Sequence, residues 1–371
     1  MMKRLSSIII ELLLPILALQ AEQANDSLLT DTTTVKESEP RKENVFKRMF
    51  RKFTDIDENY IEPQRYLFTG MLQATYTYDI YTLRCDDSQK QSITFASDGS
   101  MKLGPYFGWR WVFAGYMFTL GTNYDKSKTE IDFSFYTSQI GIDLFYRRTG
   151  SDYRVRNAKF GDASYTKALQ NISFDGVQSG ITGLNLYYIF NHRRFSYPAA
   201  FAQSTRQRRS CGSWMAGIGY TRNTLSLDYE KLQALIDDKL DTEDIQLDSG
   251  LQFKSAAYYD INVSAGYAYN IVFSKNFLVC VGGQLAVSYK ESSGRTNGMY
   301  KDNRFSFRNI APNLIGRFAI VYNNSRWYAG FSAIVRSNNY QDERFTANNT
   351  FGNTNLYVGY NFGLKKKYRK K

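Results

Sequence analysis

Apolar and polar side chains alternate along residues 258–273, and this alternation is the clearest structural signal in the chain. The odd positions carry apolar or aromatic side chains and the even positions are mostly small or polar: Tyr259, Ile261, Val263, Ala265, Tyr267, Tyr269, Ile271 and Phe273 against Asp260, Asn262, Ser264, Gly266, Ala268 and Asn270. Because successive side chains of a strand point to opposite faces, one face is apolar and the other polar. The pattern recurs to the C-terminus and predicts a transmembrane antiparallel up-and-down β-barrel, with lipid outside and water inside.

About twelve strands are expected, with ten to fourteen possible. They lie at residues 66–80, 93–108, 111–121, 130–147, 179–190, 195–205, 212–222, 257–273, 277–290, 305–322, 326–338 and 353–364. An even number is usual for single-chain bacterial barrels. A hidden strand pair around residues 153–160 would give fourteen, whereas merging 195–205 with 212–222 would lower the number.

The connections fall into short turns and long loops. Tight turns are expected at Trp109-Arg110, Ser274-Lys275-Asn276 and Asn323-Asn324-Ser325. With a periplasmic N-terminus all three lie on the periplasmic side, where barrels keep short turns. Long segments at 83–92, 223–256, 291–304 and 339–352 then lie outside. The same count places the long 148–178 segment in the periplasm and the brief 191–194 link outside. Both placements conflict with the rule that short turns lie in the periplasm and long loops lie outside.

The N-terminal region precedes the barrel in sequence and has three parts. Residues 1–21, with Lys3 and Arg4 before an apolar stretch, have the layout of a signal peptide, with a cytoplasmic amphipathic helix as the alternative. Residues 22–64 are expected to be a periplasmic leader. Its 43–53 segment has helical periodicity, which suits a helix on an anionic membrane surface or one packed on the barrel rim. The barrel is expected at 65–364 and a basic periplasmic tail at 365–371.

Composition favours a barrel over a helical membrane protein. The mean hydropathy is −0.44, and no apolar run of membrane-spanning length follows the N-terminus. Aromatic residues reach 16%, which fits belts at both membrane interfaces. The interface candidates are Trp109, Trp111, Trp327, Tyr269, Phe273, Tyr360 and Phe362.

The net charge of +12 is best explained by anionic lipid at the rims, because no nucleic-acid motif is present. Three scattered cysteines and a single histidine have no metal-ligand spacing, so neither a metal nor a cofactor is expected. Cys280 lies on the inward phase of its strand, which favours a buried thiol over a redox role. The carboxylates of the 223–256 loop lack calcium-loop spacing and are best interpreted as a solvated acidic face beside a short helix.

Charged and amide side chains on the inward phase are the main functional candidates. The lumen-lining set is Arg317, Arg336, Asp260, Asn262, Asn313 and Gln284, and Asp79 and Asp143 also point inward. Such charges either line an aqueous path or pair with one another and plug the barrel. In a narrow barrel plugging is at least as probable as conduction.

His192 is the alternative candidate because any Ser/His catalytic pair must use the single histidine. It lies in a turn with Ser196 nearby, as a barrel-embedded lipid hydrolase would require. A turn histidine at the membrane interface, beside arginines that face lipid phosphates, is the simpler interpretation.

Several runs resemble an uncharacterised family of Bacteroidetes-type outer-membrane proteins, a domain of unknown function. They are Tyr60–Pro63, Gly104–Trp111, Asp143–Gly150, Tyr187–Asn191 followed by Phe195–Ala200, and Gln207–Ser210 running into Gly212–Ser213. The resemblance spans roughly Tyr60 to Gly363, implies an outer-membrane barrel and supplies no activity. A basic tail after the final strand departs from barrels that end in an aromatic residue.

The sequence therefore predicts an outer-membrane barrel with both termini in the periplasm. It acts as a small or gated pore or as a structural surface barrel, and the alternative is a lipid hydrolase using His192. The expected partners are outer-membrane lipid and the barrel-assembly machinery, and nucleic acid is not expected.

Overall fold

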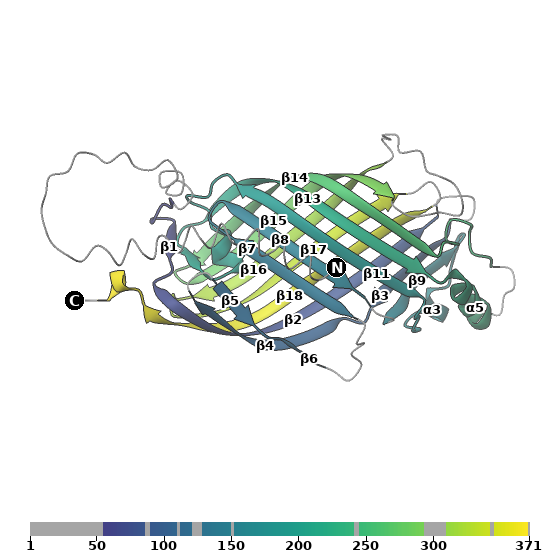
Figure 1. The fold of residues 1–371 in the computed structure, drawn as a ribbon, viewed down its shortest axis with the longest axis horizontal. Coiled ribbons are helices and arrows are strands. Elements are labelled where there is room, and N and C mark those ends of the chain that lie inside the picture. The colour runs from purple at the N-terminus through teal and green to yellow at the C-terminus, as the bar shows by residue number, and fades with distance from the viewer. Residues whose placement is uncertain are drawn as a thin grey trace, which may run out of the picture. The chain divides into compact units, whose positions relative to one another are not determined.

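Long antiparallel strands rich in β-branched and aromatic residues form the wall of a barrel (Figure 1). The computed structural model describes residues 55–85, 90–109, 112–120, 128–149, 152–240, 245–292, 309–341 and 345–369. The expected signal peptide and the 43–53 helix lie outside these ranges. None of the helices in these ranges is long and apolar enough to cross a membrane.

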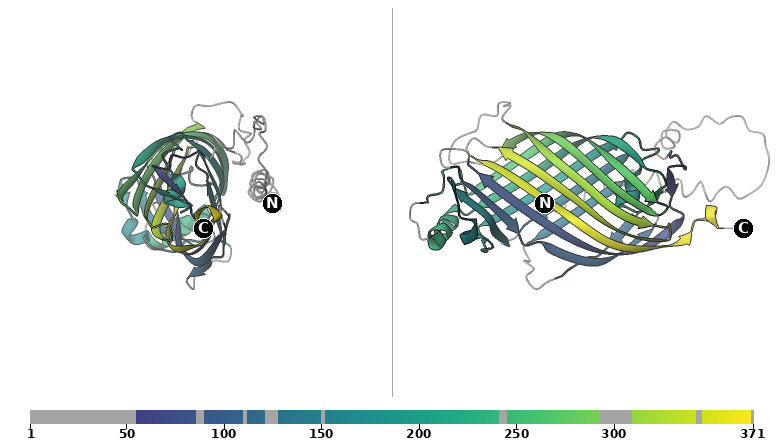
Figure 2. Two further views of the ribbon diagram at one scale, coloured as in Figure 1. Left: turned by 90° about the vertical axis from the view of Figure 1, so that its left-hand side faces the viewer. Right: turned by 180° about the vertical axis from the view of Figure 1, so that it is seen from behind.

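The wall follows the order β4–β2–β18–β17–β16–β15–β14–β13–β11–β8–β7, all antiparallel. The strands are β2 (Tyr66–Arg84), β3 (Ser92–Ser97), β4 (Ser100–Trp109), β5 (Val112–Gly115), β6 (Phe118–Leu120), β7 (Thr129–Tyr136), β8 (Ile140–Arg148), β11 (Val177–Ile189), β13 (Cys211–Leu227), β14 (Ser255–Ser274), β15 (Phe277–Ser292), β16 (Ile310–Asn323), β17 (Trp327–Gln341) and β18 (Thr346–Leu364). The last strand, β18, pairs with the first wall strand, β2, over almost its whole length. Figure 2 shows β14 to β18 from behind as one continuous, tilted wall.

The described wall has twelve strands, as the sequence predicts, if β3 with β4 and β5 with β6 are each counted as one strand. The wall is not closed by strand pairing. Among the described residues β7 pairs only with β8, and β5 and β6 pair only with β4. We call the gap between β5–β6 and β7 the seam.

The two faces of the wall differ as the alternation predicts. Ile261 and Val263 on β14 are 61% and 62% exposed, whereas the neighbouring Asp260, on the other face of the strand, is completely buried. The same contrast holds on β13 and β15 to β18, where exposed Trp214, Leu285, Leu314, Trp327 and Leu356 stand on the outer face. An outer face of this kind needs lipid against it, so the fold is that of a transmembrane β-barrel.

Two of the predicted strands are wrong. Residues 130–147 form two strands, β7 and β8, joined by a turn in which the Thr137 hydroxyl accepts from the amide of Ile140 at 2.8 Å. Residues 195–205 are not a wall strand, because Ser196 caps helix α4 (Tyr197–Phe201) by accepting from the amide of Ala199. The two errors cancel in the strand count but not in the connections.

With these two strands corrected, the 148–178 and 191–194 connections change ends of the barrel, and the conflict in the predicted connections disappears. The 190–210 segment lies at the same end as the short turns, here called the turn end, and 152–176 lies at the opposite loop end (Figure 1). Residues 153–160 form one strand, β9 (Tyr153–Phe160), which extends the sheet beyond the rim by pairing with β3. The alternative of a strand pair around 153–160 that adds two strands to the wall is therefore not what forms: β9 pairs with the short strand β10 (Ala163–Ser164) outside the wall.

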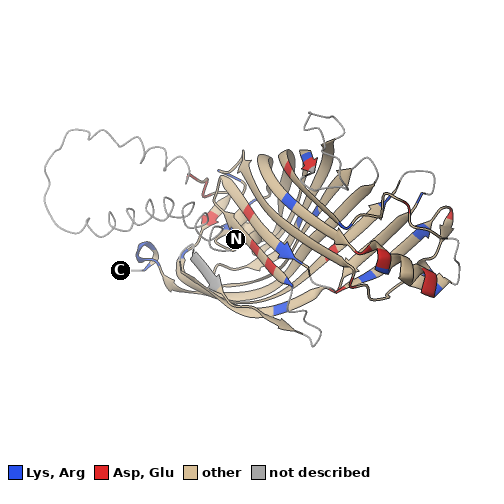
Figure 3. Ribbon diagram, turned by 45° about the vertical axis from the view of Figure 1, so that its right-hand side comes forward, with Lys and Arg blue, Asp and Glu red and all other residues tan. Residues whose placement is uncertain are grey.

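An apolar core fills the loop end. It joins β9, α3 (Thr166–Leu169) and α5 (Tyr229–Leu240), beside the short strand β10 (Ala163–Ser164), to the ends of the wall strands. Its buried members include Tyr81, Phe95, Leu225, Ile236 and Tyr258. Helix α5 matches the expected helical pattern, and its acidic residues, which are exposed, are marked red on the ribbon in Figure 3.

Candidate functional site

The 190–210 segment enters the barrel at the turn end and packs against β13 to β16 from inside; we call it the plug. Helix α4 packs Ala199 and Ala200 against inward side chains of β15 and β16, including Cys280. The Tyr197 ring lies 5.9 Å from Tyr136 on the other side of the lumen. The plug also reaches β18, because Gln203 donates to the Tyr357 hydroxyl at 2.8 Å. These contacts run across the barrel from wall to wall.

A small two-stranded sheet holds the plug at its outer end. Strand β1 (Ile61–Pro63) pairs with β12 (Thr205–Gln207), which follows α4. Glu62 forms ion pairs with Arg206, with Arg65 at 2.6 Å and with Arg208 at 3.3 Å. Burial alone would raise the pKa of Glu62, but these arginines together lower it below its ordinary value. We call this arrangement the clasp.

Arg317 and Arg336 lie deep in the barrel and share one carboxylate from the far wall. Arg317 on β16 forms an ion pair with Asp143 on β8, and Arg336 on β17 lies 3.5 Å from the same carboxylate. Arg317 also donates to Gln284 at 2.7 Å. All four side chains are buried. This arginine cluster joins β8 to β15, β16 and β17 through the lumen.

Aromatic rings complete the arginine cluster. The Arg317 guanidinium lies 4.9 Å from the centre of the Tyr187 ring and 5.9 Å from that of Tyr197, so the plug covers it directly. Arg336 lies 4.8 Å from the Phe145 ring. Cation–π contacts and a shared carboxylate compensate charges that have lost their water.

The other three predicted lumen residues meet at a lysine that sequence reasoning missed. Lys290 donates to Asn313 at 3.1 Å and lies 3.9 Å from Asp260, which in turn accepts from Asn262 at 3.2 Å. All four are buried. Asp260 therefore compensates Lys290 and not the two arginines.

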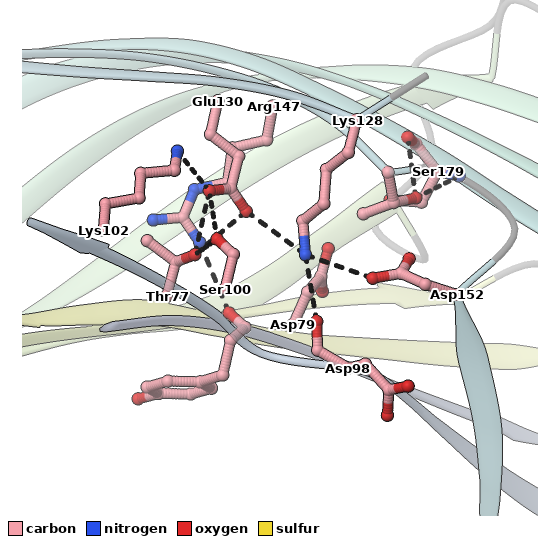
Figure 4. Close-up of polar contacts among 12 residues, drawn as sticks. Thr77, Asp79, Asp98, Ser100, Lys102, Lys128, Glu130, Arg147, Asp152 and Ser179 are labelled. Carbon is pink, nitrogen blue, oxygen red and sulfur yellow. Dashed lines mark hydrogen bonds and ion pairs between the residues drawn. The ribbon is translucent and has the colours of Figure 1, made fainter. Parts of the chain in front are cut away.

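A second set of charges lies beside the seam and was also missed (Figure 4). Glu130 on β7 accepts from Lys102 at 2.8 Å, from Ser100 at 2.9 Å and from Thr77 at 2.8 Å. Lys128 lies 3.6 Å from Glu130 and 3.2 Å from Asp152. We call these residues the Glu130 cluster. Inward polar residues on a correctly bounded β7, Glu130, Asp132 and Ser134, were the sequence signal for it.

A cavity of about 690 Å³ separates the plug from the Glu130 cluster. It is lined by side chains of β2, β4, β6, β7, β17 and β18 and by Phe201 and Ala202 of the plug segment. Both sides of the seam contribute to this lining. The barrel interior is therefore packed against β13 to β16 and hollow against the seam.

His192 is not placed for serine catalysis. Its Nε2 lies 2.9 Å from the amide nitrogen of Gln139, and its ring packs edge-on against Tyr188. The hydroxyl of Ser196, the nearby serine, instead contacts Thr205 at 2.7 Å and caps α4. The described residues contain no group of three His, Cys, Asp or Glu side chains that would hold a metal.

The aromatic interface candidates lie on the outer face near the turn end. Trp109, Trp327, Tyr269, Phe273 and Phe362 are exposed, Tyr360 is half-buried, and Trp111 lies outside the described residues. Trp327 packs on Tyr360 at a ring separation of 4.5 Å. Together these side chains mark one aromatic belt.

The family model for a domain of unknown function, DUF4421, matches residues 55–362, and the chain belongs to this family. This confirms the resemblance to a family of unknown function. No curated protein matches.

Several solved barrels are weakly similar. The outer membrane protein OprG from Pseudomonas aeruginosa is 10% identical, with a TM-score of 0.21, over 81% of this chain and 98% of that one. The P. putida toluene transporter TodX is 9% identical, with a TM-score of 0.19, over 81% and 91%. The beta domain of the Bordetella autotransporter Brka is 9% identical, with a TM-score of 0.28, over 78% and 98%. Likenesses of this size carry no argument about activity.

Proposed function

We propose that the protein is an outer-membrane barrel whose axial path is closed at rest and opens only when the plug leaves the lumen. The observation that carries this proposal is the arginine cluster under Tyr197. It places buried charges, a plug ring and three wall strands in one contact network across the barrel. In this arrangement the two arginines act as struts and not as an anion filter.

The clasp supports the same function. Glu62 and its three arginines bind the plug to the segment that leads into β2. A force or a partner that moves this segment would therefore also move the plug. Both termini of the described chain lie at the turn end (Figure 1). We assign this end to the periplasm because barrels keep their short turns there.

The contacts of Ser196 and His192 do not favour the alternative of a hydrolase built on this pair. The Ser196 hydroxyl is engaged by the plug's own cap, and the His192 ring is engaged by Gln139, so neither forms the nucleophile–base pair that acyl transfer needs.

Conductance in planar bilayers tests the proposal. The intact protein is expected to be electrically silent, whereas a variant with residues 196–206 replaced by a glycine-serine linker should show stepwise conductance. Tyr197→Phe, which keeps the ring stacking, is the matched control and should stay silent. Stepwise openings of the intact protein with the same conductance as the linker variant would contradict a closed resting state.

A further inference from the structure

The basic tail that follows β18 is folded back onto the rim of the barrel at the turn end. The backbone amide of Lys365 donates to the carbonyl oxygen of Arg65 at 3.0 Å, and its Nζ donates to that of Gln64 at 2.7 Å. The Tyr368 ring contacts two cations, because the Arg65 guanidinium lies 5.9 Å and the Lys367 Nζ 5.8 Å from its centre. These contacts hold the tail beside the first residues of β2.

The tail gathers positive charge in one part of the rim, at the turn end of β17, β18 and β2. We call this part the basic sector. Its members are all exposed: Arg65, Arg326, Lys366, Lys367 and Arg369. Among the described residues, the acid that pairs with one of them is Glu62, which is buried and already shared by three arginines. Most of the charge in the sector is therefore not compensated by carboxylates of the described chain.

The outer face next to the basic sector carries a continuous group of aromatic rings. Phe107 on β4 lies 6.0 Å from Phe68 on β2, which stacks on Phe362 of β18 at 5.5 Å. Tyr360 lies 6.3 Å from Phe362 and 4.5 Å from Trp327 on β17. Phe107, Trp327 and Phe362 are exposed. The rings therefore form one apolar surface that crosses four strands.

Arg326 joins the charges to the rings. Its Nε donates to the Tyr360 hydroxyl at 2.8 Å, and its guanidinium lies 5.3 Å from the centre of that ring. Aromatic side chains of a barrel lie at the level of the lipid headgroups, and cations at that level attract anionic lipid. The two neighbouring surfaces therefore match the two parts of one molecule, a negatively charged head and an apolar chain.

The rim at β13 to β15 lacks this combination. At the β14–β15 turn, Phe273 packs on Phe277 at 5.5 Å, but Lys275 is the only charged residue of the turn. On β13, Trp214 is exposed, packs on Tyr267 at 5.1 Å and has no charged residue next to it in sequence. The aromatic belt continues there with little charge, which provides an internal comparison.

We propose that the basic sector and the rings beside it form a binding site for an anionic phospholipid, which the barrel selects there over a zwitterionic one. The phosphate oxygens would accept from Arg326, Lys366 and Lys367, and the acyl chains would pack on Phe362 and Trp327. A zwitterionic lipid gains less, because its own cation is repelled by the same charges. The site lies on the outside of the barrel, so it does not depend on the closed resting state.

Quenching of tryptophan fluorescence by lipids with brominated acyl chains tests the site in the full-length protein. Trp109→Phe, Trp111→Phe and Trp214→Phe together leave Trp327 as the reporter beside the basic sector. In vesicles of phosphatidylglycerol and phosphatidylcholine, brominating one lipid at a time gives their relative binding constants at the reporter. Phosphatidylglycerol should be favoured at least about fivefold at Trp327. In a protein that keeps only Trp214, the preference should be under about twofold.

Removing three charges of the tail separates the basic sector from the net charge of the protein. Lys366→Gln, Lys367→Gln and Arg369→Gln together should reduce the preference at Trp327 to under about twofold. The matched control replaces three exposed lysines of the loop end by glutamine: Lys159, Lys167 and Lys254. This control removes the same charge and should leave the preference unchanged. Heat-modifiable migration verifies folding of each variant.

Two results would overturn the lipid site. One is equal quenching by the two lipids at Trp327, and the other is an equal loss of preference in the tail variant and the loop-end control. Equal quenching together with binding of polyglutamate to the intact protein, but not to the tail variant, would assign the basic sector to an acidic protein partner instead.

Discussion

The wall from β13 to β18 and the wall from β4 to β7 are built differently. The first consists of strands of 14 to 20 residues with continuous pairing, and the inward side chains of β13 to β16 are packed against the plug. The second consists of strands of 3 to 10 residues that end at an unpaired seam and face a cavity. The comparison teaches that one barrel separates its tasks: one half provides closure and stability, and the other keeps open space beside polar groups.

Removing the carboxylate that pairs with the arginines of the β13–β18 wall, or one that lies on β7, should give the largest contrast. Asp143→Asn leaves Arg317 and Arg336 buried with a weaker partner, whereas the Asp132 side chain is 25% exposed and its partner Arg147 keeps its hydrogen bonds to the carbonyl oxygens of Tyr78 and Gly352. Breaking a buried ion pair costs about 3–5 kcal/mol. We expect Asp143→Asn to lower the free energy of unfolding by about that amount and Asp132→Asn by about 1 kcal/mol or less. Urea unfolding in detergent micelles measures both, and equal losses would break the comparison.

Placing arginine on either face of β14 tests whether the complete wall has lipid on one side. Ile261 is exposed on the outer face, and Ser264 lies on the inner face near Gly217. Ile261→Arg should cost about 2–4 kcal/mol near mid-bilayer, and Ser264→Arg should be tolerated better. Folding titrations into vesicles measure the difference, and the opposite order would mean that the two faces are assigned wrongly.

Acid should weaken the clasp that holds the plug between the two halves. The folded-state pKa of Glu62 is lowered, because its arginines outweigh the effect of burial. Its contribution is therefore complete above the ordinary value of 4.5 and is lost as pH falls through the folded-state pKa. Glu62→Gln should be about 1 kcal/mol less stable than the wild type at neutral pH.

The two proteins should converge as the pH falls through the lowered folded-state pKa of Glu62. Thermal unfolding across this pH range provides the measurement, with Glu58→Gln, at an exposed acid three residues before β1, as the control. A constant difference between Glu62→Gln and wild type at every pH would show that the carboxylate charge is not what holds the clasp.

The smallest effect is expected at His192, at the rim near the β7–β8 turn. His192→Ala removes one contact with Gln139 and one ring contact, so stability should change by about 0.5–1 kcal/mol. Any lipid-ester hydrolysis by the purified barrel should be equal in both proteins. A large loss in a folded His192→Ala variant would revive the hydrolase.

The sequence predicted the complete half well because period-2 alternation is unambiguous in long strands. From β14 to β18 the predicted phases agree with the exposure of Ile261, Leu285 and Leu356, and Arg317 and Arg336 lie inside. Their partner was harder to predict, because pairing with Asp143 spans 174 residues and no local pattern encodes it.

The incomplete half was predicted less well for a specific reason. Treating 130–147 as one strand puts Glu130 and Asp143 on opposite faces, whereas the turn at Thr137 resets the phase and brings both inside. Likewise, Tyr197 to Phe201 has the short aromatic and apolar pattern of a strand, and only its burial inside the barrel distinguishes it as a plug helix.

Thiol accessibility tests the central claim that the axis is closed while the cavity is open. Cys280 is buried under α4 and serves as a native probe once Cys85 and Cys211 are replaced by alanine, and Thr75→Cys in a protein lacking all three cysteines reports on the cavity. A membrane-impermeant maleimide should modify Cys280 at least about a hundredfold more slowly than the cysteine at position 75, and replacing residues 196–206 with a linker should abolish that protection. Equal labelling rates of the two cysteines in the intact protein would contradict the closed axis.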